Sequence, residues 1–165
     1  MSPEVPTHGI AGVVLRTVTE SDYPFLRSLY RSVREAEIAP TGWSDAQKQA
    51  FCDSQFELQD RHYREHFPGT AFLVIERGGE PIGRIYIDTA PGPLRLMDIA
   101  LLPAERGRRL GTAFLGWLCT WADREGRVVT LHVEANNPAR RLYQRHEFVD
   151  DGEEGPYVRM RRDPR

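Results

Sequence analysis

The chain has 165 residues, of which 40% are hydrophobic and 28% charged, and its formal net charge is −2. This length is typical of one domain with its own core, and the weakly acidic balance argues against a nucleic-acid partner. No apolar run approaches the roughly 20 residues that span a bilayer, and the polar start does not resemble a signal peptide. We therefore expect a cytoplasmic protein without a membrane partner, with a flexible arm over residues 1–9 and one domain over residues 10–163.

The first part of the sequence predicts a strand followed by two helices. Residues 13–18 form a short β-branched run that is typical of a strand. The segment from Thr19 to Asp22 then has the form of a helix N-cap, and apolar residues at three- and four-residue spacing predict a helix that ends near Arg34. A capping sequence at Ser44 opens a second helix, whose aromatic stripe favours a place in the core.

The rest of the sequence predicts a mixed α/β arrangement. Three antiparallel strands precede a helix, and the strand after that helix is expected to be parallel to the strand before it, because such crossovers usually give parallel pairs. A last helix and a closing hairpin follow. In chain order, we predict strands at 71–75, 82–87 and 94–102, a helix at 110–124, a strand at 128–133, a helix at 138–146 and hairpin strands at 148–149 and 156–160.

An arginine- and glycine-rich loop, Arg106-Gly-Arg-Arg-Leu-Gly111, stands between the third of these strands and the next helix. The first turn of a helix leaves backbone N–H groups unpaired, and the helix dipole favours negative charge there. The arginines indicate that the anion is a phosphate, whereas a basic surface turn is the alternative. The motifs of nucleoside triphosphatases and of dinucleotide-binding folds are absent from this crossover.

Two motifs carry a resemblance to a known family. The loop resembles the Arg/Gln-x-x-Gly-x-Gly/Ala loop of the GNAT superfamily of coenzyme A dependent N-acyltransferases. The segment from Asn136 to Phe148 is similar to that family's Asn-x-x-Ala-x-x-Leu-Tyr-x-x-x-Gly-Phe segment, and the order of elements is also the family's. Arg109 and Glu147 differ from it, because glycine is usual at both positions.

The resemblance implies the fold, the acyl donor and the residues that bind it. The implied fold is α/β (α+β), with a central mixed, mostly antiparallel twisted sheet of about seven strands, flanked by about four helices and splayed between strands four and five. The implied donor is acetyl-CoA, without a metal. The implied cofactor-binding residues are Ile99, Ala100, Leu101, Leu102, Arg106, Gly107, Arg108, Arg109, Leu110, Gly111, Thr112, Asn136 and Tyr143.

Acyl transfer from a thioester to an amine needs a deprotonated amine, donors for the oxyanion and a proton for the departing thiolate. The resemblance implies backbone N–H donors near Ala100 and Leu101 and makes Tyr143 the catalytic proton donor, with a core-filling role as the alternative. The sequence does not identify the general base that accepts the proton of the amine. The candidates are a water chain and the side chains of Tyr86, Asp98, His132 and Glu134.

The predicted function is the transfer of an acetyl group from acetyl-CoA to a primary amine by direct attack in a ternary complex. A noncatalytic module that binds or senses acyl-CoA on the same fold is the alternative. Cys119 lies within a helix without basic neighbours, so we expect no acyl-cysteine intermediate. Residues 147–154 hold five acids and no base, which favours a cationic acceptor unless they are only a solvated turn. The sequence leaves open whether the acceptor is a small-molecule or a peptide amine. It also leaves open whether the protein forms a homodimer.

Overall fold

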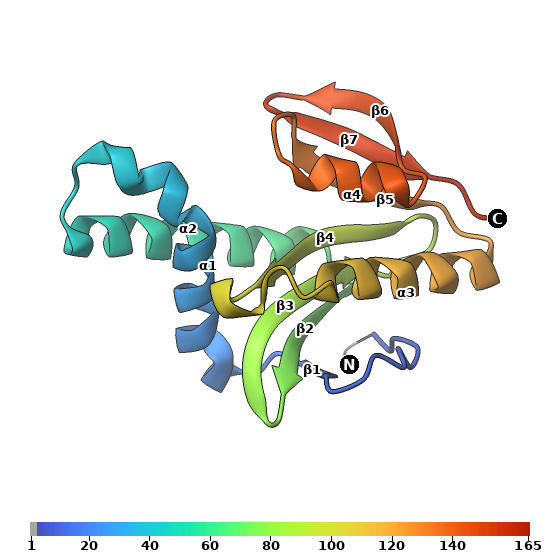
Figure 1. The fold of residues 1–165 in the computed structure, drawn as a ribbon, viewed down its shortest axis with the longest axis horizontal. Helices are drawn as coiled ribbons and strands as arrows, with labels where there is room; N and C mark the ends of the chain where they lie inside the picture. Colours follow the sequence, from blue (N-terminus) through green and yellow to red (C-terminus); the bar gives the residue numbers. More distant parts are fainter. Residues whose placement is uncertain (1–2) are drawn as a thin grey trace.

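The computed structural model of the chain describes residues 3–165, which form one seven-stranded sheet with four α-helices (Figure 1). Short 3-10 turns at residues 20–22, 39–41 and 103–105 connect some of these elements. The elements are β1 (Val14–Thr17), α1 (Tyr23–Ile38), α2 (Asp45–His66), β2 (Thr70–Arg77), β3 (Glu80–Asp88), β4 (Leu94–Leu101), α3 (Leu110–Glu125), β5 (Val129–Glu134), α4 (Ala139–Arg145), β6 (Val149–Glu154) and β7 (Tyr157–Arg162). Within the described residues, none of the helices combines the length and apolar character needed to cross a bilayer.

The helix α2 begins where its capping sequence predicts, whereas Thr19 caps the 3-10 turn of residues 20–22 and α1 begins only at Tyr23. Ser44 accepts a hydrogen bond of 3.1 Å from the backbone of Gln47, whose side chain accepts one of 2.8 Å from the backbone of Ser44. The end of α1 differs from the prediction, because the helix continues past Arg34 to Ile38. The 3-10 turn of residues 39–41 follows directly, and Gly42, whose φ of 72° is left-handed, ends it.

The strands lie in the order β1-β2-β3-β4-β5-β7-β6. Neighbours are antiparallel except β4 and β5, which are parallel as the crossover through α3 predicts. Over the described residues, the β4–β5 register runs only from Leu94↔Val129 to Leu96↔Leu131. Beyond these pairs the strands diverge, so the predicted splay of the sheet is confirmed. In Figure 1 the hairpin of β6 and β7 lies apart from the β1–β4 part of the sheet.

A bulge in β4 decides which side chains enter the splay. The register with β3 shifts from Tyr86↔Asp98 to Ile87↔Leu96, which leaves Met97 as the extra residue. An extra residue reverses the alternation of faces along the rest of a strand. Ile99 and Leu101 therefore pack with the core beneath α3, as Leu94 and Leu96 do, while Asp98 and Ala100 face α1 and α2.

The apolar core lies mainly between the sheet and α3. This helix buries Phe114, Trp117, Leu118 and Trp121, and α1 and α2 bury Leu26, Leu29, Cys52 and Phe56 on the other face. The start of the chain also contacts α3, because the ring of His8 lies with its centroid 5.7 Å from that of Phe114 and 6.4 Å from that of Trp117. The division into an arm over residues 1–9 and a domain over residues 10–163 stays a prediction, and residues 1–2 lie outside the described part.

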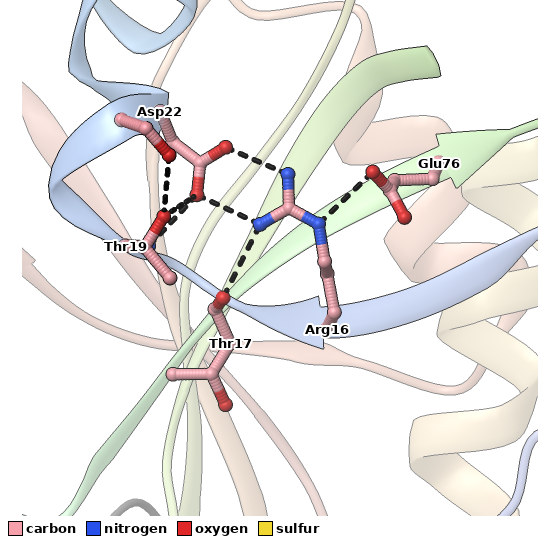
Figure 2. A network of polar contacts seen from close by, with 6 residues as sticks. Arg16, Thr17, Thr19, Asp22 and Glu76 are labelled. Carbon is pink, nitrogen blue, oxygen red and sulfur yellow. Dashed lines mark hydrogen bonds and ion pairs between the residues drawn. The ribbon is translucent and has the colours of Figure 1, made fainter. Parts of the chain in front are cut away.

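An ionic network joins β1 to the segment that opens α1 (Figure 2). Arg16 donates two hydrogen bonds to the Asp22 carboxylate, at 2.7 and 2.8 Å, and its Nε lies 2.9 Å from a Glu76 oxygen on β2. Asp22 also accepts a 2.7 Å hydrogen bond from the backbone of Thr19. The Arg16 hydrogen bonds hold the pKa of Asp22 at about 2, below its usual value. The network thus fixes the start of α1 against the sheet.

Candidate active site

A groove of about 770 Å³ runs from the end of β4 across the start of α3 to α4. Its walls include ten of the thirteen predicted cofactor-binding residues: Ile99, Ala100, Leu101, Arg106, Gly107, Arg109, Leu110, Gly111, Thr112 and Tyr143. Leu102, Arg108 and Asn136 do not line it. Asn137 lines it instead, and its side chain accepts a 2.9 Å hydrogen bond from the backbone of Ala139 at the start of α4.

The backbone at the start of α3 has the features of an anion site. The helical hydrogen bonds begin with the 3.0 Å bond from the N–H of Ala113 to the carbonyl of Arg109. The N–H groups of Leu110, Gly111 and Thr112 precede that bond and therefore have no partner within the helix. A Cβ atom at Gly111 would meet nothing within 4 Å, so a larger side chain there would extend into the groove.

Both residues that replace a family glycine adopt left-handed backbone. Arg109, which caps α3, has φ 63°, and Glu147, which follows α4, has φ 71°. Such a conformation costs a residue with a side chain about 1 to 2 kcal/mol. The loop therefore keeps the conformation that glycine would favour, and the arginine at position 109 adds a cation to the groove wall.

Tyr143 on α4 lies where the groove meets a small apolar cavity beneath it. Its ring centroid is 5.9 Å from that of Phe148, and its hydroxyl has no hydrogen-bond partner within residues 3–165. Burial, with a smaller effect from the charge of Asp98, raises the pKa of Tyr143 to about 12. The phenol is therefore protonated at neutral pH and free to donate into the groove.

A second cavity, of about 240 Å³, lies on the opposite face of the sheet between α1 and the start of β7. Its charged residues are Arg34 and Glu37 from α1, Arg84 from β3, Asp98 from β4 and Glu134 from β5. Its remaining walls are Leu29, Tyr30, Val33, Gln59, Ala100 and Tyr157. Ala100 and Val33 line both this cavity and the groove, so the two spaces meet at the splay.

Comparison with known proteins identifies the family. The model of the acetyltransferase (GNAT) family matches residues 27–148. The chain belongs to the GNAT acetyltransferase family. This GNAT protein is therefore an acetyltransferase that uses acetyl-CoA, as its motifs predict. No curated protein matches its sequence.

Solved structures share the fold of this GNAT chain. A PaiA N-acetyltransferase from Thermoplasma acidophilum in complex with coenzyme A has 16% sequence identity and a TM-score of 0.66, with coverage of 92% of this chain and 98% of that one. An acetyltransferase from Thermus thermophilus has 21% identity and a TM-score of 0.66, covering 95% and 99%. A spermidine N-acetyltransferase from Vibrio cholerae, in complex with CoA and spermine, has 18% identity and a TM-score of 0.63, covering 93% and 96%. At these identities the likeness establishes the fold alone.

The candidate bases of this acetyltransferase fall into two groups. Asp98 and Glu134 line the second cavity. Tyr86 is only 1% exposed, and its burial raises its pKa to about 12, which removes it as a base at neutral pH. His132 shares the face of Glu134 on β5, but its Nε2 lies 3.1 Å from Glu154 on β6 and it lines neither space.

Two other sequence features of the GNAT chain lie away from the site. Burial raises the pKa of Cys119 to about 11, which agrees with the expectation that this thiol is not a nucleophile. The five acids of residues 147–154 line neither space. Within the described residues four of them have a basic partner, through the pairs Glu147–Arg165, Asp150–Arg140, Asp151–Arg159 and Glu154–Arg159. The acidic segment therefore gives no support to a cationic acceptor.

Sequence reasoning missed many of the residues that line the two spaces, among them Val33, Asn137, Leu142 and Tyr157. Asn137 precedes a proline at a helix start, which is a usual signal for a capping side chain. Leu142 belongs to the quoted family motif and could have been assigned to the groove. Val33 and Tyr157 carry no such signal, because only the tertiary fold brings α1 and β7 to opposite sides of the splay.

Proposed function

We propose that this protein transfers the acetyl group of acetyl-CoA to a primary amine by direct attack in a complex that contains both substrates. One observation carries the proposal. The donor groove and the second cavity lie on opposite faces of the sheet and meet at Ala100, where β4 has left β5. A donor on one face and an acceptor on the other would meet there without an intermediate carrier on the protein.

The groove fits coenzyme A at its phosphate end. The free N–H groups at the start of α3 and the side chains of Arg106 and Arg109 provide donors and positive charge for a pyrophosphate. Arg106 also donates a 3.1 Å hydrogen bond to the carbonyl of Leu101, which ties the loop to the end of β4. Ile99 and Leu101 give the groove an apolar wall toward the splay.

Acetyl-CoA, when bound, supplies an acyl group activated as a thioester. We assign the oxyanion donors to backbone N–H groups near Ala100 and Leu101, because both residues line the groove and Ala100 also lines the second cavity. Tyr143 provides the proton for the sulfur, since its hydroxyl is protonated and without a partner among the described residues. The proton of the attacking amine leaves toward the second cavity, where Asp98 and Glu134 can accept it directly or through water.

Release of the coenzyme A thiol, measured with acetyl-CoA and a panel of primary amines, tests the function. Gly111→Trp should place an indole in the groove, and it should abolish both thiol release and the thermal stabilisation by acetyl-CoA. Gly116→Trp is the matched control, because Gly116 lies on the same helix with open space at its Cβ and lines neither space. Equal stabilisation of both variants by acetyl-CoA would place the donor elsewhere.

The remaining assignments rest on the sequence. We propose a cytoplasmic location and one functional domain over residues 10–163. Cell fractionation and limited proteolysis check them.

A further inference from the structure

Glu134 stands directly across the splay from Ala100. The last β4–β5 register pair is Leu96↔Leu131, and β4 then contains one extra residue at its bulge. If Met97 is left out, counting along both strands from the pair Leu96↔Leu131 aligns Ala100 with Glu134. Both residues line the second cavity, which agrees with this count.

The carboxylate of Glu134 has no competing partner. Within residues 3–165, its oxygens take part in no hydrogen bond or ion pair, and the side chain is exposed. The next residue on the same face, His132, pairs with Glu154, and Arg159 also pairs with Glu154. Basic groups near β5 are thus already engaged by β6, which leaves the Glu134 charge available to a ligand.

The arginines of the second cavity are also engaged. Arg84 is buried, and it donates to Asp98 at 2.5 Å, to Gln59 at 3.0 Å and to the hydroxyl of Tyr86 at 3.4 Å. Arg34 donates to Glu37 at 2.6 Å and to the hydroxyl of Tyr30. Because Glu37 and Asp98 pair with these two cations, Glu134 is the one charged side chain of the cavity without a partner within residues 3–165.

Two of the side chains that line the cavity with Glu134 are exposed and largely apolar. Tyr157 is the register partner of Glu134 on β7 and is 45% exposed, and Val33 on α1 is 50% exposed. Exposed apolar side chains around a single free carboxylate suit an ammonium group on an apolar stem.

We infer that Glu134 is the acceptor-binding residue of this enzyme and that it takes a primary ammonium cation on a short apolar stem. The inference rests on the proposed function. Glu134 accepts hydrogen bonds from the ammonium and holds its nitrogen opposite Ala100. One N–H proton passes to the carboxylate or to its bound water. The freed nitrogen lone pair then forms the C–N bond to the thioester carbon. The C–S bond of the adduct breaks, and the departing sulfur receives the proton of Tyr143. The adduct nitrogen loses its second proton through water to the Tyr143 phenolate, which leaves the amide, the coenzyme A thiol and a reprotonated Tyr143.

Two amines of the same shape test this inference. Benzylamine is a cation at neutral pH, whereas phenylhydrazine has an NH in place of the CH₂ and is uncharged there. Glu134→Gln should lower kcat/KM for benzylamine about 10-fold, the effect of losing one charged hydrogen-bond partner at an accessible site. It should change kcat/KM for phenylhydrazine less than about 3-fold, within the scatter expected for a neutral contact. Added salt should reduce kcat/KM for benzylamine in the wild type and not in Glu134→Gln.

Two further variants separate charge from shape. Glu153→Gln removes the same charge from a β6 acid that lines neither space and should match the wild type with both amines. Tyr157→Ala should raise KM for both amines alike, because it removes an apolar wall. Equal losses for the two amines in Glu134→Gln would overturn the inference, as would a wild type that binds acetyl-CoA but does not acetylate benzylamine. Absence of acetyl-CoA binding would instead overturn the proposed function.

Discussion

The replacement of Asp22 by asparagine tests whether the network in Figure 2 stabilises the fold through its charge. The variant keeps the shape of the side chain and an oxygen for the Thr19 N–H, but it loses the ion pair with Arg16. The pKa of Asp22 is about 2 in the folded protein, against an ordinary value of 3.8. At about 1.4 kcal/mol for each pKa unit, the folded state gains about 2.5 kcal/mol at neutral pH.

The sign of the pH dependence follows from the lowered pKa. A carboxylate with a depressed pKa stabilises the fold fully above its unfolded-state pKa, and this stability is lost as the pH falls through the folded-state value. The difference in unfolding free energy between wild type and Asp22→Asn should therefore be about 2.5 kcal/mol at pH 7 and about half of that at pH 3.

Urea unfolding followed by tryptophan fluorescence measures both values. Asp163→Asn is the control, because its ion pair with Arg161 is exposed to solvent and should contribute little to stability. A loss in Asp22→Asn no larger than that of the control, or one independent of pH, would refute the reasoning. Asp22 directly precedes α1, so the same variant should also make the α1 residues that line the second cavity more mobile.

Three further predictions concern the reaction. Tyr143→Phe should lower kcat by about 10² to 10⁴-fold, while acetyl-CoA should still stabilise the variant as much as the wild type. Because Tyr143 stays protonated, its ionisation should not lower the wild-type kcat below about pH 10. Near-normal turnover of the variant, with chemistry as the rate-limiting step, would exclude Tyr143 as the acid. Gly83→Ala should lower kcat/KM, and it should lower the free energy of unfolding by about 1 to 3 kcal/mol, because a Cβ there overlaps the carbonyl oxygen of Ala100. Wild-type kinetics in this variant would show that β4 can move away from the added methyl group without loss of function. Cys119→Ser should remain active, and acetylated Cys119 found by mass spectrometry would contradict direct transfer.

Much of the fold could be predicted because its signals are local. The capping sequence at Ser44 marks the start of α2, and the one at Thr19 marks the 3-10 turn that leads into α1. The crossover through α3 determines the parallel pairing of β4 and β5. The family motifs also direct attention to the start of α3 and to Tyr143, which the structure brings into one groove.

The rest depends on geometry that residue types do not encode. The bulge at Met97 reverses the faces of β4, so alternation alone would put Asp98 on the wrong side of the sheet. Neither arginine nor glutamate signals positive φ, yet Arg109 and Glu147 both adopt it. The acidic run of residues 147–154 suggested a free charged surface, whereas arginines distant in sequence fold back onto most of it.

The divergence of β4 from β5 creates a strand edge inside the molecule. The outer edges of a sheet present unpaired N–H and C=O groups to any passing chain, which is a route to aggregation. Here the backbone groups on the β5 side of residues 97–101 lie between the groove and the second cavity, and α1 and α4 contribute to the walls. The fold therefore places its unpaired strand edge at the site itself and not at the outer rim of the sheet.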